Sequence, residues 1–196
     1  MKKSNIDNVI ESIKKLNSEL EPIIKNIKSE ITKESLWTSF SIDKINDMNF
    51  KKCKNKAGLY FFQVRFEGGI DEYLESNNIF ETIDRAWNED ERGSIPPIVK
   101  ERFDVLKSKL LKGEWFYFYL GKSNNLEKRI MEHLGTKGSK STSKLNLYNI
   151  KNSLFKNCEF KIKIKELNEF KEEEYYWVIS KVEKDLRKKL NPICGK

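Results

Sequence analysis

Two short aromatic segments of this chain each place a tyrosine close to a glycine, and the stretch after the second segment adds two more polar groups. The first segment contains Gly58-Leu59-Tyr60 and the second contains Tyr119-Leu120-Gly121. Arg129 and His133 follow four residues apart, so a helix would place both side chains on one face. Two phenols, a guanidinium and an imidazole could together surround a space of the size of a phosphate group.

The second segment continues as Gly121-Lys-Ser-Asn-Asn-Leu-Glu-Lys-Arg129. Together with Gly58-Leu59-Tyr60, this run resembles the GIY-YIG nuclease family, whose two tripeptides lie on neighbouring strands and whose helix begins as G-K-S-x-N-L-x-x-R. The resemblance covers roughly residues 58–66 and 115–195. It implies a small antiparallel sheet flanked by helices, and hydrolysis of phosphodiester bonds.

The resemblance also implies a role for each polar side chain. Tyr60 would contact the attacking water and act as its base, although a phenol with a pKa near 10 needs a nearby metal or cation to do so at neutral pH. Tyr119 would position the water or the phosphate. Arg129 would offer its planar fork to the non-bridging oxygens, a geometry that lysine cannot copy. His133 would hydrogen-bond the phosphate or the nucleophile.

The expected metal ligand lies near the end of the chain. Members of the family hold one metal ion through a glutamate on the last helix, and Glu183 stands at the family's distance before Pro192. The resemblance therefore implies one Mg²⁺ or Mn²⁺ ion per active site, bound by Glu183. Taken alone, Glu183 could instead form an i,i+4 ion pair with Arg187. The chain also carries Gly195 where many relatives have an asparagine, whose amide helps to hold the last helix or orders a backbone or phosphate contact. Asn191 lies close enough in the sequence to substitute for it.

Positive charge is concentrated around these motifs. Residues 115–165 contain eleven Lys and Arg against three Glu, whereas residues 67–114 contain seven Lys and Arg against twelve Asp and Glu. A basic block of this kind is expected for a site that binds a polyanion, here double-stranded DNA, although a Lys-rich solvated surface would look the same. The expected contacts to the DNA backbone are Lys122, Ser123, Lys128, Lys137, Lys140 and Lys144.

The hydrophobic pattern predicts the elements that would position these residues. Aromatic and β-branched residues favour strands at 57–66 and 115–120, and alternation favours a third strand at 159–167 with one face in water. Helices are expected over about 70–87, 99–111, 125–134 and 168–190, with Asn124 or Asn125 as the cap of the third. The chain is therefore expected to be α+β, with a small antiparallel sheet, flanking helices and a helical insertion at about 67–114 between the first two core strands.

The N-terminal region carries a different pattern. Apolar residues recur at alternating spacings of three and four, as in a coiled-coil seam, from Ile6 to Ile27. Pro22 would kink this helix or begin a second one. The seam could mediate a homodimer or pack on its own domain. We therefore divide the chain into an N-terminal helical region, 1–49, and a nuclease-like domain, 50–196.

Composition excludes several classes of protein. Three cysteines without a C-x-x-C pair argue against a disulfide framework or a zinc ribbon, and favour a reducing cytoplasm. No apolar stretch approaches the roughly 18 residues of a membrane span, so no membrane partner is expected. The N-terminus lacks the apolar core of a secretory signal.

These observations together predict a metal-dependent DNA endonuclease of the GIY-YIG type, in particular a type II restriction enzyme. Two alternatives remain open: a repair or mobile-element nuclease, and a catalytically silent nucleic-acid binding module. The recognition sequence cannot be predicted from these patterns.

Overall fold

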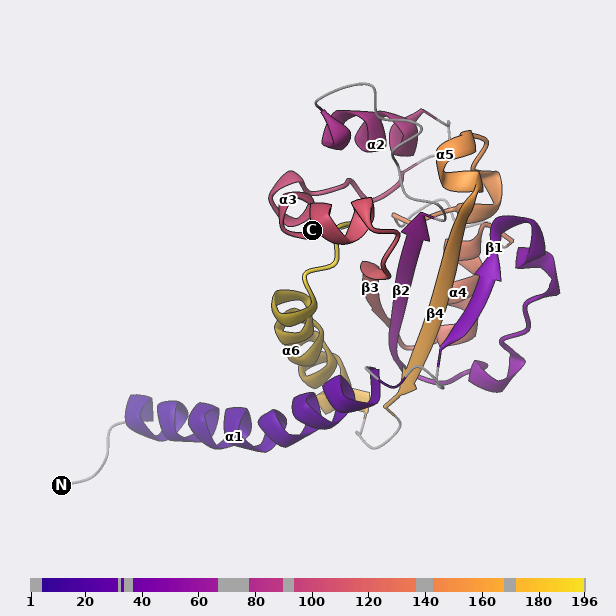
Figure 1. The fold of residues 1–196 in the computed structure, drawn as a ribbon. Coiled ribbons are helices and arrows are strands. Elements are labelled where there is room, and N and C mark those ends of the chain that lie inside the picture. The colour runs from indigo at the N-terminus through magenta and orange to yellow at the C-terminus, as the bar shows by residue number, and fades with distance from the viewer. Residues whose placement is uncertain are drawn as a thin grey trace.

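The computed structural model describes residues 5–31, 33, 37–66, 78–89, 94–136, 143–167 and 172–195. At its centre is an antiparallel sheet of four strands in the order β1-β4-β2-β3 (Figure 1). The α+β class and the antiparallel sheet predicted from the sequence are confirmed. The elements are α1 (Asn5–Ile31), β1 (Thr38–Ser41), the short 3-10 helices η2 (Ile42–Asp47) and η3 (Lys51–Cys53), β2 (Gly58–Phe66), α2 (Ile79–Asn88), α3 (Lys100–Leu111), β3 (Phe116–Ser123), α4 (Leu126–Leu134), η5 (Leu147–Asn149), α5 (Ser153–Lys156), β4 (Cys158–Glu166) and α6 (Glu172–Leu190).

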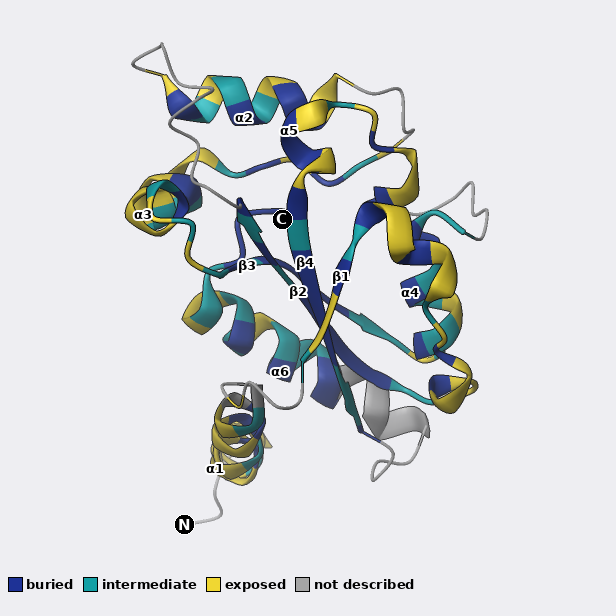
Figure 2. Cartoon of the chain, turned by 45° about the vertical axis from the view of Figure 1, so that its right-hand side comes forward, coloured by how far each residue is buried: buried dark blue, intermediate teal, exposed yellow. Residues whose placement is uncertain are grey.

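Helices cover both faces of the sheet, so its middle strands are buried on both sides (Figure 2). Tyr60 and Phe62 of β2 belong to the larger core cluster, which includes residues of α2, α3 and α4. Leu59 and Phe61 point to the opposite face, where they pack with α6 and the second half of α1. An aromatic run such as β2 suits this position, because hydrophobic side chains are needed on both of its faces.

Strand β1 is a feature that the sequence pattern did not predict. It has four residues and pairs with the edge of β4, with Phe40 opposite Phe160. Phe40 and the following Ile42 and Ile45 are buried in the larger core cluster. Residues 38–50 therefore belong to the same packed unit as the strands that carry the tyrosines.

The prediction that one face of the 159–167 strand lies in water is wrong. Lys161 and Lys163 of β4 are only 6% and 4% exposed. The Lys161 ammonium lies 4.1 Å from the centre of the Trp115 ring, and that of Lys163 lies 5.7 Å from Trp37 and donates to the Glu30 carbonyl of α1. Aromatic faces and a carbonyl replace much of the water around these cations, which allows lysines in a covered position.

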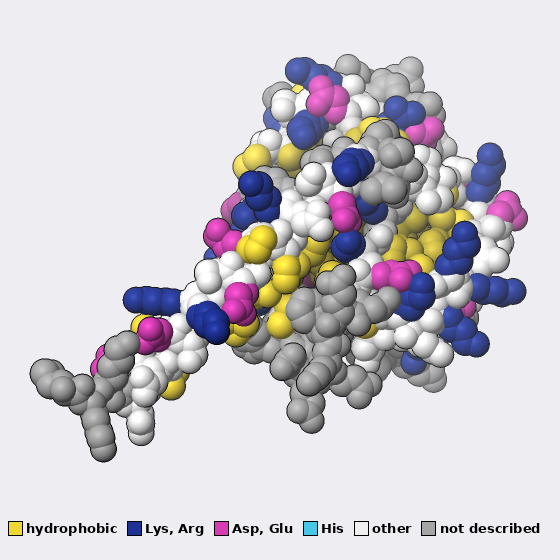
Figure 3. Space-filling view, turned by 90° about the horizontal axis from the view of Figure 1, so that it is seen from below, with side chains coloured by type: hydrophobic (Ala, Val, Ile, Leu, Met, Phe, Trp, Pro, Cys, Tyr) yellow, Lys and Arg dark blue, Asp and Glu magenta, His cyan; other side chains and the backbone are white. Residues whose placement is uncertain are grey.

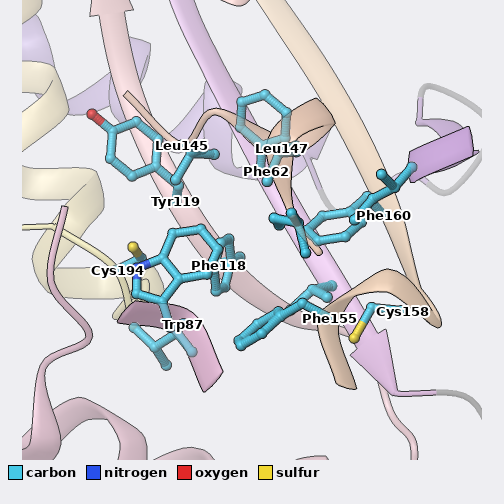
Figure 4. Packing of buried hydrophobic residues seen from close by; sticks show 14 of the residues in the cluster. Phe62, Trp87, Phe118, Tyr119, Leu145, Leu147, Phe155, Cys158, Phe160 and Cys194 are labelled. Atoms are coloured by element: carbon cyan, nitrogen blue, oxygen red, sulfur yellow. The ribbon is translucent and has the colours of Figure 1, made fainter. Parts of the chain in front are cut away.

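The segment between β2 and β3 contributes helices α2 and α3 to the core. Trp87 of α2 packs edge-on against Phe118 of β3, and its indole N–H donates to the Pro96 carbonyl at 2.9 Å. Figure 4 shows this cluster, with Phe155 and Cys194 beside Trp87 and with the hydroxyl of Tyr119 pointing away from the other labelled side chains. The region is thus integrated into the core on which β3 packs.

Helix α1 is continuous through Pro22 and divides into two halves. Leu20, Ile24 and Ile27 are buried against α6. The first half extends away from the body of the molecule, where hydrophobic side chains lie along it (Figure 3). Four of them are 45–70% exposed: Ile6, Val9, Ile10 and Ile13. No helix in the described ranges is long and apolar enough to cross a membrane.

Candidate active site

The hydroxyl of Tyr60 lies between two of the predicted site residues. His133 Nε2 is 2.9 Å from Tyr60 Oη, and Arg129 Nε donates to the same oxygen at 3.3 Å. Tyr60 comes from the central strand β2, whereas both partners come from α4. Asn125 begins that helix by accepting a hydrogen bond from the Lys128 amide, and Gly135 ends it in a left-handed conformation. One turn of helix therefore sets the imidazole and the guanidinium on either side of one phenol.

The backbone fixes the tautomer of His133. The amide of Leu145 donates to His133 Nδ1 at 3.0 Å, so this nitrogen carries no proton. Burial, together with the positive charges of Arg129 and Lys144, holds the pKa of His133 well below its usual value. The neutral ring then carries its proton on Nε2 and donates it to Tyr60 Oη. The phenol oxygen thus accepts two hydrogen bonds, and its own proton must point elsewhere.

The burial of His133 predicts how the free energy of unfolding should depend on pH. In the unfolded chain His133 protonates below about pH 6.5, whereas the folded pKa is much lower, so the unfolded state binds more protons in this range. The free energy of unfolding should therefore fall by up to about 1.4 kcal/mol per pH unit as the pH drops below 6.5. Urea titrations from pH 7.5 to 5 measure this slope. A His133→Gln variant should lose it, since His133 is the only histidine of the chain; equal slopes would contradict the assignment.

Both motif glycines are required by close approaches of the backbone. Gly121 stands opposite Tyr60 in the sheet, and a Cβ added to Gly121 would lie 2.2 Å from Tyr60 Oη. A Cβ on Gly58 would lie 2.1 Å from the carbonyl oxygen of Lys165 on β4. The two glycines therefore have separate functions: Gly121 makes room for the phenol and Gly58 allows the strands to meet.

Tyr119 reaches the same space through an irregularity in the sheet. Tyr119 pairs with Phe62 and Tyr117 with Gln63, so Phe118 is the extra residue of a bulge. The Tyr119 ring stacks with Tyr60 at 6.2 Å between ring centres and lies 4.8 Å from His133. Burial raises the pKa of both tyrosines, although Arg129 and Arg187 oppose that shift at Tyr119. Both are therefore neutral phenols at pH 7 in this structure.

Arg129 is held in place by hydrogen bonds that include three to described residues. Besides Tyr60, it donates from Nη1 to Glu132 at 2.8 Å and from Nη2 to the Ser143 carbonyl at 2.6 Å. Glu132 is itself buried, and its carboxylate balances the guanidinium charge. The sequence analysis did not single out Glu132. Its position three residues after Arg129 on one helix face was the signal that could have found it.

Glu183 lies near the tyrosines but does not hydrogen-bond them. Its carboxylate is 3.2 Å from Arg187 Nε, the i,i+4 pair left open by the sequence, and 3.4 Å from Lys122 Nζ on β3. Lys122 also donates to Ser180 of α6, and Arg187 donates to the Leu120 carbonyl and lies 5.6 Å from the Tyr119 ring. Two cations thus hold Glu183 beside the Tyr119 end of the tyrosine pair, where its charge acts on both phenols.

The donor set determines which metal would fit here. Across the residues that the structure describes, no three His, Cys, Asp or Glu side chains gather as a metal-binding group. A preformed site of the zinc type is therefore not found among them. Mg²⁺ needs fewer protein ligands, because it commonly binds one or two carboxylates and completes its coordination shell with water and substrate phosphate oxygens. Glu183 is 15% exposed and lines an open hollow, so it fits that mode of binding.

The predicted contacts to DNA are placed differently from one another. Lys128 is exposed on α4, and Ser123 forms a turn by bonding the backbone of Asn125. Lys144 is partly buried and its amide donates to the Ser94 carbonyl. Lys137 and Lys140 lie outside the described residues. Lys122 faces Glu183, so this lysine sits at the candidate site itself.

The end of the chain is held by an arginine rather than by an asparagine amide. Arg102 of α3 donates from Nη1 to the Pro192 carbonyl at 3.1 Å and to the Gly195 carbonyl at 2.9 Å. Gly195 has a φ of +96°, and a Cβ there would lie 3.3 Å from both the Tyr119 ring and Arg187. Glycine therefore suits this position, and Arg102 holds the backbone at Pro192 and Gly195. The sequence analysis did not identify Arg102.

Comparisons of the chain with models of protein families, with curated proteins and with solved structures found no match. The function of this protein is therefore inferred below from the geometry of these residues and from the sequence motifs that contain them.

Proposed function

We propose that this protein is a metal-dependent DNA endonuclease that resembles the GIY-YIG nucleases. One observation carries the proposal: the Tyr60 hydroxyl lies opposite Gly121, with His133 Nε2 at 2.9 Å and Arg129 Nε at 3.3 Å. A tyrosine with only a packing role does not require two polar donors in a buried space. A tyrosine that must lose its proton does, because both donors stabilise the phenolate oxygen.

In this proposal Tyr60 prepares the water that attacks phosphorus. The raised pKa of the buried phenol keeps it protonated until substrate binds. The phenol loses that proton to solvent, and the phenolate then takes one from the attacking water. The water oxygen bonds to phosphorus while the bond from phosphorus to the leaving oxygen breaks, and the leaving oxygen takes a proton from solvent. His133 and Arg129 hold the phenolate, and Tyr119 orients the water from the neighbouring strand. Lys122 and Arg187, now paired with Glu183, lie where they can meet the non-bridging oxygens.

Glu183 is the proposed ligand of one Mg²⁺ or Mn²⁺ ion. Such an ion supplies charge neutralisation on the phosphate and lowers the pKa of nearby water and phenol groups. In the chain itself, Glu183 is the acidic side chain whose charge acts on both tyrosines. Lys122 and Arg187 fix its carboxylate in one orientation until the substrate arrives.

The first test is cleavage of supercoiled plasmid. The purified protein should nick or cut it with Mg²⁺ or Mn²⁺ and should be inactive with EDTA, because the scheme depends on an ion at Glu183. The products are separated on a gel. Discrete fragments would favour the proposed restriction role, and structure-dependent nicking would favour a repair or mobile-element role. Binding without cutting in any metal would favour the silent binding module, and cutting in EDTA would contradict the mechanism.

We also propose that the exposed half of α1 pairs with a second copy of the chain. The exposed apolar residues are interspersed with two acidic residues, Asp7 and Glu11, and are followed by two basic residues, Lys14 and Lys15. Antiparallel pairing of two such helices buries both apolar stripes and opposes unlike charges. A two-fold pair also brings two sites to the two strands of a palindrome.

Sedimentation should therefore show a dimer, either alone or on duplex DNA. The double variant Val9→Glu and Ile13→Glu should be monomeric, because it places charge in the buried stripe. The control Asn8→Glu and Ser12→Glu adds the same charge at exposed positions outside the stripe and should remain dimeric. A wild-type protein that remains monomeric with and without duplex DNA, and still cuts both strands, would exclude this arrangement.

A further inference from the structure

A hollow of about 380 Å³ opens beside Glu183, on the side of α6 that faces α3. Arg102 comes from α3, Asn191 follows α6, and α6 itself provides the other residues of the lining. These are Glu183, Lys184, Arg187 and Lys188. Four cationic side chains thus surround one carboxylate, and the hollow carries an excess of positive charge.

The two guanidinium groups are held in place by the fold. Arg102 is bonded to the carbonyls of Pro192 and Gly195, and Arg187 to Glu183 and the Leu120 carbonyl. Both line the same hollow, and burial, together with the charge of Arg187, lowers the pKa of Arg102. Two like charges held side by side cost electrostatic free energy, and an anion bound between them would recover it.

The C-terminus of α6 explains only part of this charge. Cations in the last turn of a helix are stabilised by its dipole, and this accounts for Arg187 and Lys188. It does not account for Arg102, which the chain delivers from α3, 85 positions before Arg187. A helix from the segment between β2 and β3 therefore contributes a fixed positive group to the same hollow as the candidate metal ligand.

We propose that this hollow binds a backbone phosphate of duplex DNA next to the phosphate that is cut. The inference rests on the proposed function, because Glu183 belongs to both the candidate site and the lining of the hollow. It assigns to α3 a role in gripping the substrate. The volume of about 380 Å³ accommodates a phosphate with several waters, each of which occupies roughly 30 Å³ in the liquid.

Duplex binding, measured by fluorescence anisotropy in EDTA over a range of salt concentrations, tests the inference without any cleavage. Lys184→Gln removes one exposed charge from the hollow, and Lys189→Gln removes one from the other side of the same helix, where it lines a second hollow against α1. Loss of one phosphate contact should lower the slope of log affinity against log salt by about 0.9 for Lys184→Gln and leave it unchanged for Lys189→Gln. Equal slopes for the two variants would overturn the inference.

Arg102→Gln provides a second test on α3, with the exposed Lys109→Gln as its control. The slope should again fall for Arg102→Gln alone, in protein whose circular dichroism shows that it is folded. If Arg102→Gln does not fold, Lys184→Gln still tests the inference, because Lys184 does not make the bonds to the Pro192 and Gly195 carbonyls that Arg102 makes. Inorganic phosphate at constant ionic strength should compete with the duplex; phosphate binding without duplex binding would overturn the assignment to DNA.

These results separate the inference from the proposed function. A metal-activated nuclease with equal slopes would retain the function and lose the phosphate subsite. A selective slope change in a protein that cuts nothing would retain the subsite and reduce the function to DNA binding.

Discussion

Replacing Glu183 by glutamine should abolish DNA cleavage and leave duplex binding nearly intact. The substitution keeps the size of the side chain and one oxygen that can accept from Lys122 or Arg187, but it removes the second acceptor oxygen and the negative charge that would hold the ion. A bound divalent metal contributes several kcal/mol of transition-state stabilisation, so the rate should fall by about 10³-fold or more. Binding should not weaken, because the change removes a charge that repels phosphate.

Asp185→Asn is the matched control on the same helix. Asp185 pairs with Lys181 at 3.6 Å and lines the hollow that faces α1, so the same loss of charge occurs away from the candidate site. Single-turnover cleavage of a labelled duplex and anisotropy in EDTA measure the two effects separately. An inactive Asp185→Asn beside an active Glu183→Gln would place the metal elsewhere and refute our assignment of the last helix.

The local patterns of the sequence predicted most of the fold that positions this site. The strands that carry Tyr60 and Tyr119 are found within one to three residues of their predicted bounds, because long aromatic runs next to glycine leave few other conformations. Helix α4 was predicted with its cap at Asn124 or Asn125, and Asn125 is the cap. Helix α2 begins at Ile79, whereas residues 70–77 of the predicted helix lie outside the described residues.

What the sequence could not predict depends on contacts between distant parts of the chain. Strand β1 has only four residues and forms because the edge of β4 is available to it, so no local pattern marks it. The buried Lys161 and Lys163 alternate with apolar residues as an exposed face would. Their burial is tolerated because of groups distant in the sequence, which include the rings of Trp115 and Trp37 and the Glu30 carbonyl. The Leu145 amide that fixes the His133 tautomer is a backbone group and leaves no trace in the side-chain sequence.

The same distinction between local and distant contacts applies to the candidate site. Spacing within one helix predicted that Arg129 and His133 would meet, and the structure places both on Tyr60 Oη. Spacing also left open the Glu183–Arg187 pair, which is present. It gave no sign that Lys122 would face Glu183, or that Arg102 would lie beside Arg187. Those two contacts join β3 to α6 and α3 to α6, and they depend on how the elements pack.

Tyr60→Phe should have the second largest effect, because it removes the oxygen on which His133 and Arg129 converge. Loss of a general base lowers rates by about 10²–10⁴-fold. Below the pKa of the phenol, the phenolate fraction rises tenfold per pH unit, and the raised pKa keeps this true through the neutral range. The wild-type rate should therefore increase with pH between 6 and 9, and the residual rate of Tyr60→Phe should lose that dependence.

The same substitution should also reduce stability. It leaves the His133 Nε2–H and the Arg129 Nε–H without their shared acceptor in a buried space, which costs about 1–3 kcal/mol in the free energy of unfolding. Tyr117→Phe is the control: Tyr117 lies on the neighbouring strand but packs with the opposite core cluster, so its loss should not alter the pH dependence of cleavage. Rate–pH profiles of the three proteins, with urea titrations, separate chemistry from folding. If Tyr60→Phe retained the wild-type profile, another group would activate the water, and the pair of donors on Tyr60 would serve only to hold α4 against the sheet.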